Sequence, residues 1–106
     1  MSTQKGRDDL WWSGRAWEDY LHWQRNDPKK VEDIHRLIEN IRREPWTGLG
    51  KPEPLKGDYK GWWSRRIDQE HRLVYRLFDI AKPEAKQPRE RITVIQIAQC
   101  RFHYKK

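Results

Sequence analysis

The chain has 106 residues, and this length predicts one domain, because a single core usually organises roughly 100 to 200 residues. Charged residues make up 37% and hydrophobic residues 35%, a balance that would favour disorder without the large area that seven tryptophans can bury. No stretch approaches the ~18 apolar residues of a membrane span, and a single cysteine, Cys100, excludes an internal disulfide. With no hydrophobic run at its start, the sequence predicts a cytoplasmic protein without membrane association.

The net charge of +7 favours a polyanionic partner, since basic side chains attract phosphates and release their counterions. A basic surface that is merely solvated is the alternative. The core is thin for a chain of this size, so we also expect a second chain to add buried area.

The first half of the chain has the spacing of two helices. After an N-terminal extension at residues 1–9, residues 10–12 predict a short strand that leads into a helix capped by Ser13. A second helix is expected from Pro28 to just before Pro45, which disfavours helical geometry in the residue preceding it. Its apolar stripe consists of Val31, Ile34, Leu37, Ile38 and Ile41.

The second half has the pattern of a sheet. Glycines and prolines predict a loop over residues 46–59. Runs rich in β-branched and aromatic residues then predict strands at 62–67, 71–78 and 92–100. Segment 79–91 contains two prolines and is expected to be an extended hairpin loop with a mobile tip. The predicted fold is α+β, a single domain over residues 1–106 in which two N-terminal helices pack on an antiparallel sheet.

A glutamate in the predicted loop is the first candidate for chemistry. Glu53 stands between two prolines that restrict its backbone, and Lys51 and Lys56 on either side favour its ionised form. These features suit a general base. An exposed loop glutamate without a function would have the same surroundings.

Arginines and a histidine supply the complementary groups. The predicted hairpin carries Arg65, Arg66, Arg72 and Arg76, whose guanidinium groups can grip phosphate oxygens or simply be solvated. His103 follows the last strand beside Tyr104, and the ordinary pKa of histidine, ~6.5, allows either protonation state at neutral pH. A surface histidine would fit the same pattern.

This set of groups fits RNA cleavage without a metal. The 2′-hydroxyl of RNA is an internal nucleophile, so a protein needs only to remove its proton, stabilise the added charge and protonate the departing oxygen. A metal site is disfavoured because no pair of histidines has HExxH spacing, and Cys100 with His103 supplies only half of a zinc site. We therefore expect no metal and no cofactor.

Four stretches resemble the YoeB/Txe family, the ribosome-dependent messenger RNA interferases that serve as toxins of bacterial toxin and antitoxin pairs within the RelE-like group. They are WSGRAWEDYLHWQ at 12–24, GLGKPEPLKG at 48–57, GWWSRRIDQEHRLVY at 61–75 and CRFHY at 100–104. The resemblance implies a RelE/YoeB-like ribonuclease fold and cleavage of messenger RNA in the small-subunit decoding site of the ribosome. It also implies inhibition by a YefM/Phd-type antitoxin and assembly as a homodimer.

By this resemblance, Glu53 would be the general base, Arg72 would stabilise the transition state and His103 would be the general acid. The residues that would position or steer the RNA are Lys51, Lys56, Arg65, Arg66 and Tyr104. Two departures from the family, the extension at 1–9 and the long segment 79–91, would affect ribosome docking, dimer contacts or antitoxin fit.

Two rivals come from other functional classes. The first is a basic module that binds RNA or ribosomes and blocks translation without cutting. The second is a DNA-binding regulator, which has poor support because neither helix combines basic and amide side chains on one exposed recognition face.

Overall fold

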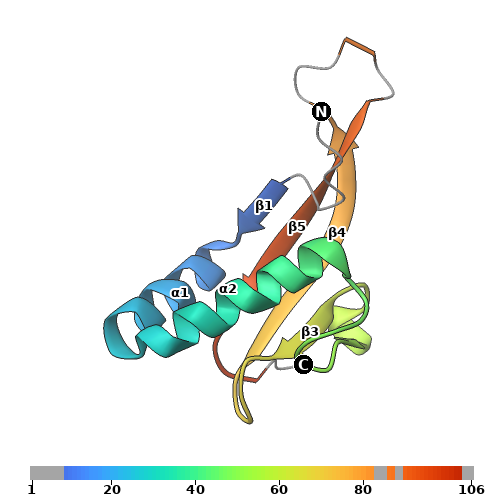
Figure 1. Cartoon of the computed structure of the whole chain (residues 1–106). Helices are drawn as coiled ribbons and strands as arrows, with labels where there is room; N and C mark the ends of the chain where they lie inside the picture. The colour runs from blue at the N-terminus through green and yellow to red at the C-terminus, as the bar shows by residue number, and fades with distance from the viewer. Residues whose placement is uncertain (1–8, 83–85, 88–89, 104–106) are drawn as a thin grey trace.

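The computed structural model describes residues 9–82, 86–87 and 90–103. Two helices, α1 (Gly14–Asn26) and α2 (Pro28–Arg43), lie side by side on one face of a five-stranded sheet (Figure 1). The strands are β1 (Asp9–Trp12), β2 (Glu53–Pro54), β3 (Trp63–Arg66), β4 (Arg72–Ala81) and β5 (Arg91–Gln99). Their order across the sheet is β1-β5-β4-β3-β2. The α+β class with two helices packed on a sheet is therefore confirmed.

The sheet is mixed, which corrects the prediction that it is antiparallel throughout. β1 runs parallel to β5, with Leu10 opposite Ile95, whereas the pairs β5–β4, β4–β3 and β3–β2 are antiparallel. A strand of four residues has too little pattern to specify its partner. After Trp12 the chain leaves the sheet and enters α1 at Gly14.

Both helices begin and end where local chemistry requires. The Ser13 hydroxyl accepts a hydrogen bond from the Ala16 N–H at 3.0 Å and so caps α1, as predicted. Pro28 occupies the first turn of α2, and the helix ends at Arg43, before Pro45. The main core lies between the helices and the sheet. Its buried residues are Ala16, Trp23, Ile34, Leu37, Ile38, Ile41, Leu73, Tyr75, Ile95, Ile97 and Cys100.

The hairpin of β4 and β5 is longer than predicted. Asp79, Ile80 and Ala81 pair with Thr93, Ile92 and Arg91, so both strands continue into the segment that was expected to be loop. The prediction of a loop over 79–91 is therefore wrong at both ends, and only residues 82–90 lie between the strands. The hairpin projects beyond the helices in Figure 1. The expected mobile tip and the extension at 1–9 fall largely outside the described residues.

The predicted loop over residues 46–59 contains two short elements. β2 pairs with β3, and a 3₁₀ helix follows at Gly57–Tyr59. Glu53 is therefore an edge-strand residue and not a loop residue. Among the described residues, no helix is long and apolar enough to cross a membrane.

Candidate active site

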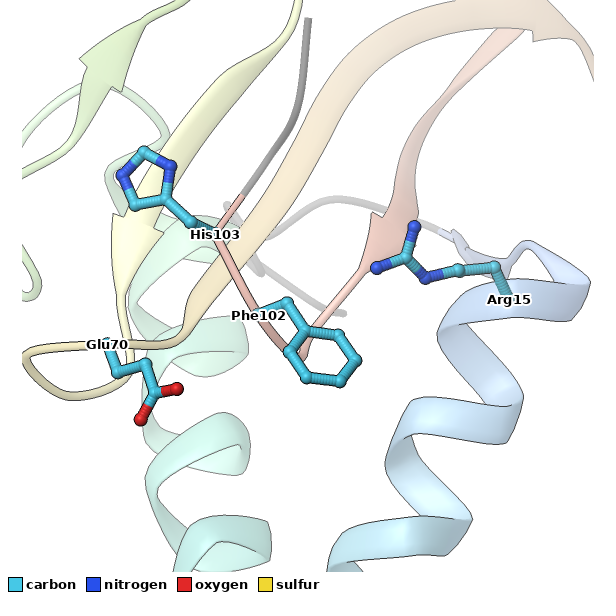
Figure 2. A pocket seen from close by; sticks show the side chains of 4 residues that line it. All are labelled: Arg15, Glu70, Phe102 and His103. Carbon is cyan, nitrogen blue, oxygen red and sulfur yellow. The ribbon is translucent and has the colours of Figure 1, made fainter.

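An open pocket of about 450 Å³ lies at the end of the sheet where β4 begins and β5 ends. Arg15 from the first turn of α1 faces Glu70 from the β3–β4 turn, with the ring of Phe102 between them and His103 above (Figure 2). The pocket thus brings one of the predicted catalytic residues, His103, to a surface with a cation, a carboxylate and an aromatic ring. This combination of groups suits a nucleotide.

The segment that carries His103 is held by side chains from α1 and β5. The buried Asp19 carboxylate accepts the Cys100 N–H at 3.0 Å, and the Trp23 indole donates to the Cys100 carbonyl at 2.8 Å. The Gln99 amide donates to the carbonyls of residues 101 and 102. The peptide groups after β5 are therefore bound one after another, and the backbone in front of His103 is fixed.

Burial changes the acid–base properties of two of these groups. It raises the pKa of Asp19, although the Cys100 N–H and Arg15 partly oppose the shift. Burial also raises the pKa of the Cys100 thiol far above its usual range. A thiol that stays protonated is a poor nucleophile, and Cys100 is a fully buried part of the core.

The β3–β4 turn is fixed by Asp68. One carboxylate oxygen accepts the N–H groups of Glu70 and His71 at 2.8 and 2.7 Å, and the other lies 3.1 Å from the Lys30 ammonium of α2. Burial acts to raise the pKa of Asp68, but these hydrogen bonds outweigh it and lower the pKa. The Lys30 pKa is raised, chiefly by the hydrogen bond to Asp68. The turn that bears Glu70 is therefore tied to the helix layer.

A second group of predicted residues shares the face of the sheet that carries no helix. Residues directly opposite each other in antiparallel strands lie on the same face. Glu53 is opposite Ser64, Ser64 is opposite Val74, and Arg66 is opposite Arg72. Glu53, Arg66 and Arg72 therefore lie on one face, across three neighbouring strands.

Arg72 connects this face to the pocket. Its backbone N–H donates to the Phe102 carbonyl at 3.0 Å, so the residue next to His103 pairs with the first residue of β4. The Arg72 side chain bends over the β3–β4 turn, where Nη1 donates to the carbonyls of residues 68, 69 and 71 at 3.0–3.2 Å. These bonds hold the guanidinium group near the turn that borders the pocket. Glu53 is not among the residues that line the pocket.

Arg65 is not available to contact RNA, which corrects its assignment as a steering residue. Its side chain is fully buried on the helix side of β3. There the guanidinium group donates to the Asn40 side chain, to the Tyr75 hydroxyl and to the carbonyls of residues 44, 47 and 49. All the acceptors belong to the protein, so Arg65 fastens the end of α2 and the following loop to the sheet.

The remaining predicted residues are on the surface or outside the described part. Lys51 and Lys56 are exposed on either side of β2, and Lys51 has a left-handed backbone with a φ of 53°. Tyr104 lies outside the described residues. Within the described residues, no three His, Cys, Asp or Glu side chains are grouped so that they could hold a metal ion.

Sequence reasoning missed Arg15, Glu70 and Phe102 as lining residues of the pocket, and it missed His71, which binds the Phe102 N–H. Each belongs to one of the quoted motifs, but motif membership alone does not show which side chains converge. Arg15 and Phe102 are 87 positions apart, and the sequence contains no periodic signal for such a contact.

Comparison with known proteins extends over almost the whole described chain. The family described as YoeB-like toxin of bacterial type II toxin-antitoxin system matches residues 12–104. The Toxin YoeB of Escherichia coli K12 is 46% identical over 95 residues, which cover 90% of this chain and 98% of that protein. The Toxin YoeB of Streptomyces coelicolor A3(2) is 49% identical over 92 residues, covering 87% and 94%.

Solved structures agree with this match. A YoeB/ParE toxin from Agrobacterium tumefaciens superposes with a TM-score of 0.79 at 47% identity, covering 92% of this chain and all of that one. A YoeB dimer from Staphylococcus aureus gives a TM-score of 0.70 at 39% identity, and a heterotetrameric YoeB-YefM complex from the same organism gives 0.71 at 39%. Both comparisons cover 92% of this chain and 99% of the other.

Proposed function

This chain belongs to the family of YoeB-like toxins of bacterial type II toxin-antitoxin systems, and we propose that it is an endoribonuclease that cleaves messenger RNA on the ribosome. One observation carries the proposal. The hydrogen bond from the Arg72 N–H to the Phe102 carbonyl joins the pocket at His103 to the sheet face that bears Glu53 and Arg66. An acid–base group and a row of cations therefore border the same end of the sheet.

In the proposed reaction, the Glu53 carboxylate removes the proton of the RNA 2′-hydroxyl. The resulting oxygen attacks the adjacent phosphorus, and the bond from phosphorus to the 5′-oxygen breaks. His103, as the imidazolium, gives its proton to that 5′-oxygen, while Arg72 stabilises the charge that accumulates on the phosphoryl oxygens. The products are a 2′,3′-cyclic phosphate and a 5′-hydroxyl, and the enzyme supplies no covalent intermediate.

Substrate binding is assigned to the cations around this chemistry. Arg66 shares the open face with Arg72, and Lys51 and Lys56 flank Glu53 along the chain. Arg66 and Lys56, together with Tyr104, would position the RNA, and Lys51 would attract it electrostatically. The net charge of +7 supports attraction to a polyanion of the size of a ribosome.

We further propose a YefM-type antitoxin and a homodimer as protein assemblies of this chain. The solved YoeB-YefM complex and YoeB dimer from Staphylococcus aureus support both assignments. An acidic, partly disordered antitoxin segment would order on the basic face and block it. Co-purification with a small acidic protein, if a neighbouring gene encodes one, tests the antitoxin, and sedimentation of the isolated chain tests the homodimer.

The decisive experiment separates cleavage from binding. Glu53→Ala and His103→Ala are expected to abolish the cutting of ribosome-bound message while leaving cosedimentation with ribosomes largely intact. Cut sites are mapped as new 5′ ends of transcripts after brief expression, and they are expected at a fixed offset within codons. Arg36→Ala is the matched control, because Arg36 is an exposed cation on α2 with a side chain 65% accessible. Undiminished cutting by both active-site variants would contradict the proposal.

The rival is a basic module that blocks the ribosome without cutting. One observation favours it: Glu53 does not line the pocket that contains His103. A blocker would arrest translation in vitro without producing new 5′ ends. Both alanine variants would then arrest translation as well as the unmodified chain.

A further inference from the structure

His71, the residue before β4, contacts the segment that carries His103. Its ring packs edge-on against Trp23, with 4.8 Å between centroids, and lies 6.0 Å from the ring of Phe102. Its Nδ1 accepts a hydrogen bond from the Phe102 N–H at 2.7 Å. An imidazole nitrogen accepts only when it carries no proton, so this bond requires the neutral ring with its proton on Nε2. The Glu70 carboxylate lies 3.6 Å from Nε2, on the side of that proton.

The backbone that His71 contacts has an unfavourable conformation. Phe102 has a φ of 65°, in the left-handed region that a bulky side chain adopts only when its surroundings enforce it. Its N–H is held by His71, and its carbonyl accepts the Arg72 N–H at 3.0 Å and the Gln99 amide at 3.3 Å. The peptide groups on both sides of Phe102 are therefore fixed. This turn directs the chain so that His103 lines the pocket (Figure 2).

We propose that His71 is a positioning residue for His103: its unprotonated Nδ1 maintains the left-handed turn at Phe102 and thereby fixes the general acid over the scissile phosphate. This inference rests on the proposed nuclease function. His71 itself contacts neither the RNA nor the reacting atoms in this role. Its effect passes through the backbone of a single residue.

A pair of variants of equal size tests the role of the acceptor. Asn and Leu have almost the same shape, and both lose the imidazole ring, but Asn places its carbonyl oxygen where Nδ1 stood. With stalled ribosomes and saturating toxin, we expect His71→Leu to lower the single-turnover cleavage rate roughly 10- to 100-fold, as a small misplacement of a catalytic group does. His71→Asn should recover most of that rate. Ribosome affinity should stay within about twofold in both variants, because the cationic face is unchanged.

A role confined to stability would give a different result. Both variants lose the ring contacts with Trp23, so both would then lose thermal stability and cleavage rate equally. Equal rates for His71→Asn and His71→Leu would therefore overturn the proposal.

A measurement without cleavage separates this inference from the proposed function. In the unmodified, ¹⁵N-labelled chain, the N–H···N bond should give a coupling between the Phe102 backbone nitrogen and His71 Nδ1. The Phe102 amide should exchange with solvent faster in His71→Leu than in His71→Asn. If the coupling is absent or the exchange rates are equal, the positioning role fails even if the chain cuts RNA. If both signals are present but no RNA is cut, the nuclease assignment fails and His71 loses its catalytic role with it.

Discussion

Arg65 and Arg66 are consecutive residues of β3, and their side chains lie on opposite faces of the sheet. Arg65 is fully buried against the end of α2, whereas Arg66 is exposed beside Arg72. Replacing Arg65 by Met leaves three partly buried carbonyls, those of residues 44, 47 and 49, without this donor, at ~1 to 3 kcal/mol for each group that water does not reach. We expect Arg65→Met to lower the free energy of unfolding by about 3 kcal/mol or more, measured by urea denaturation.

Arg66→Met is the matched control one residue away. Because Arg66 is on the surface, its replacement should change the free energy of unfolding by no more than about 0.5 kcal/mol. It should instead weaken RNA cleavage at limiting toxin concentration. A stable Arg65→Met variant would show that the buried guanidinium is replaceable, and an unstable Arg66→Met variant would show that the two faces are not independent.

Arg72 is expected to act mainly on the rate of cleavage. If its guanidinium stabilises the charged transition state, Arg72→Ala should slow single-turnover cleavage roughly 100-fold or more, as loss of one oxyanion donor does. The backbone bond from the residue 72 N–H to the Phe102 carbonyl is retained in this variant. A loss confined to ribosome affinity would instead assign Arg72 to binding.

Lys51 is expected to act on association. It is exposed next to β2, and it has no place in the proposed chemistry. Lys51→Ala should weaken salt-sensitive binding to ribosomes. The slope of log affinity against log salt should become shallower by the amount that corresponds to about one phosphate contact. The cleavage rate at saturating toxin should be unchanged. A reduced rate at saturation would place Lys51 among the reacting groups.

The ion pair between Lys30 and Asp68 makes the free energy of unfolding depend on pH at both ends of the pH range. The pKa of Asp68 is lowered in the folded chain, so its stabilisation is present above the unfolded value of ~3.9 and is lost as the pH falls through the folded value. The Lys30 pKa is raised, so its contribution is present below ~10.4 and is lost as the pH rises through the folded value.

Asp68→Asn isolates the charge, because the amide oxygen can still accept the N–H groups of Glu70 and His71. We expect the substitution to lower the free energy of unfolding by about 1 kcal/mol at neutral pH, after allowance for solvent screening of these partly exposed groups. The difference from the unmodified chain should disappear at a pH below the folded pKa of Asp68. Urea denaturation series at several pH values check this, and a difference that persists in acid would assign the effect to packing.

Local patterns were sufficient for the helices but not for the contacts between distant segments. The stripe from Val31 to Ile41 predicted α2 because helical spacing is visible within one element. The burial of Arg65 was hidden, because both Ser64 and Arg65 are buried and strand alternation alone cannot show which face of β3 meets the helices. In the β4–β5 hairpin, the two prolines suggested an early break, whereas the ladder continues to the pairing of Ala81 with Arg91.

The candidate site was predicted in part. The motifs predicted Glu53, Arg72 and His103 as catalytic residues, and the Arg72 N–H and the residue before His103 are joined through the Phe102 carbonyl. The contact of His71 with Phe102 spans 31 positions, and each residue taken alone has an ordinary local context. Such a contact depends on how the sheet brings the start of β4 to the end of β5, which is a property of the completed fold.

The bonds from Asp19 and Trp23 to Cys100 close loops of 81 and 77 residues. Closing a loop of this length carries an entropic cost that local contacts cannot offset early in folding. Both bonds exist only when α1 is docked on the sheet, so the backbone in front of His103 is held by contacts between the two ends of the chain. The proposed general acid therefore takes its place only in the completed fold.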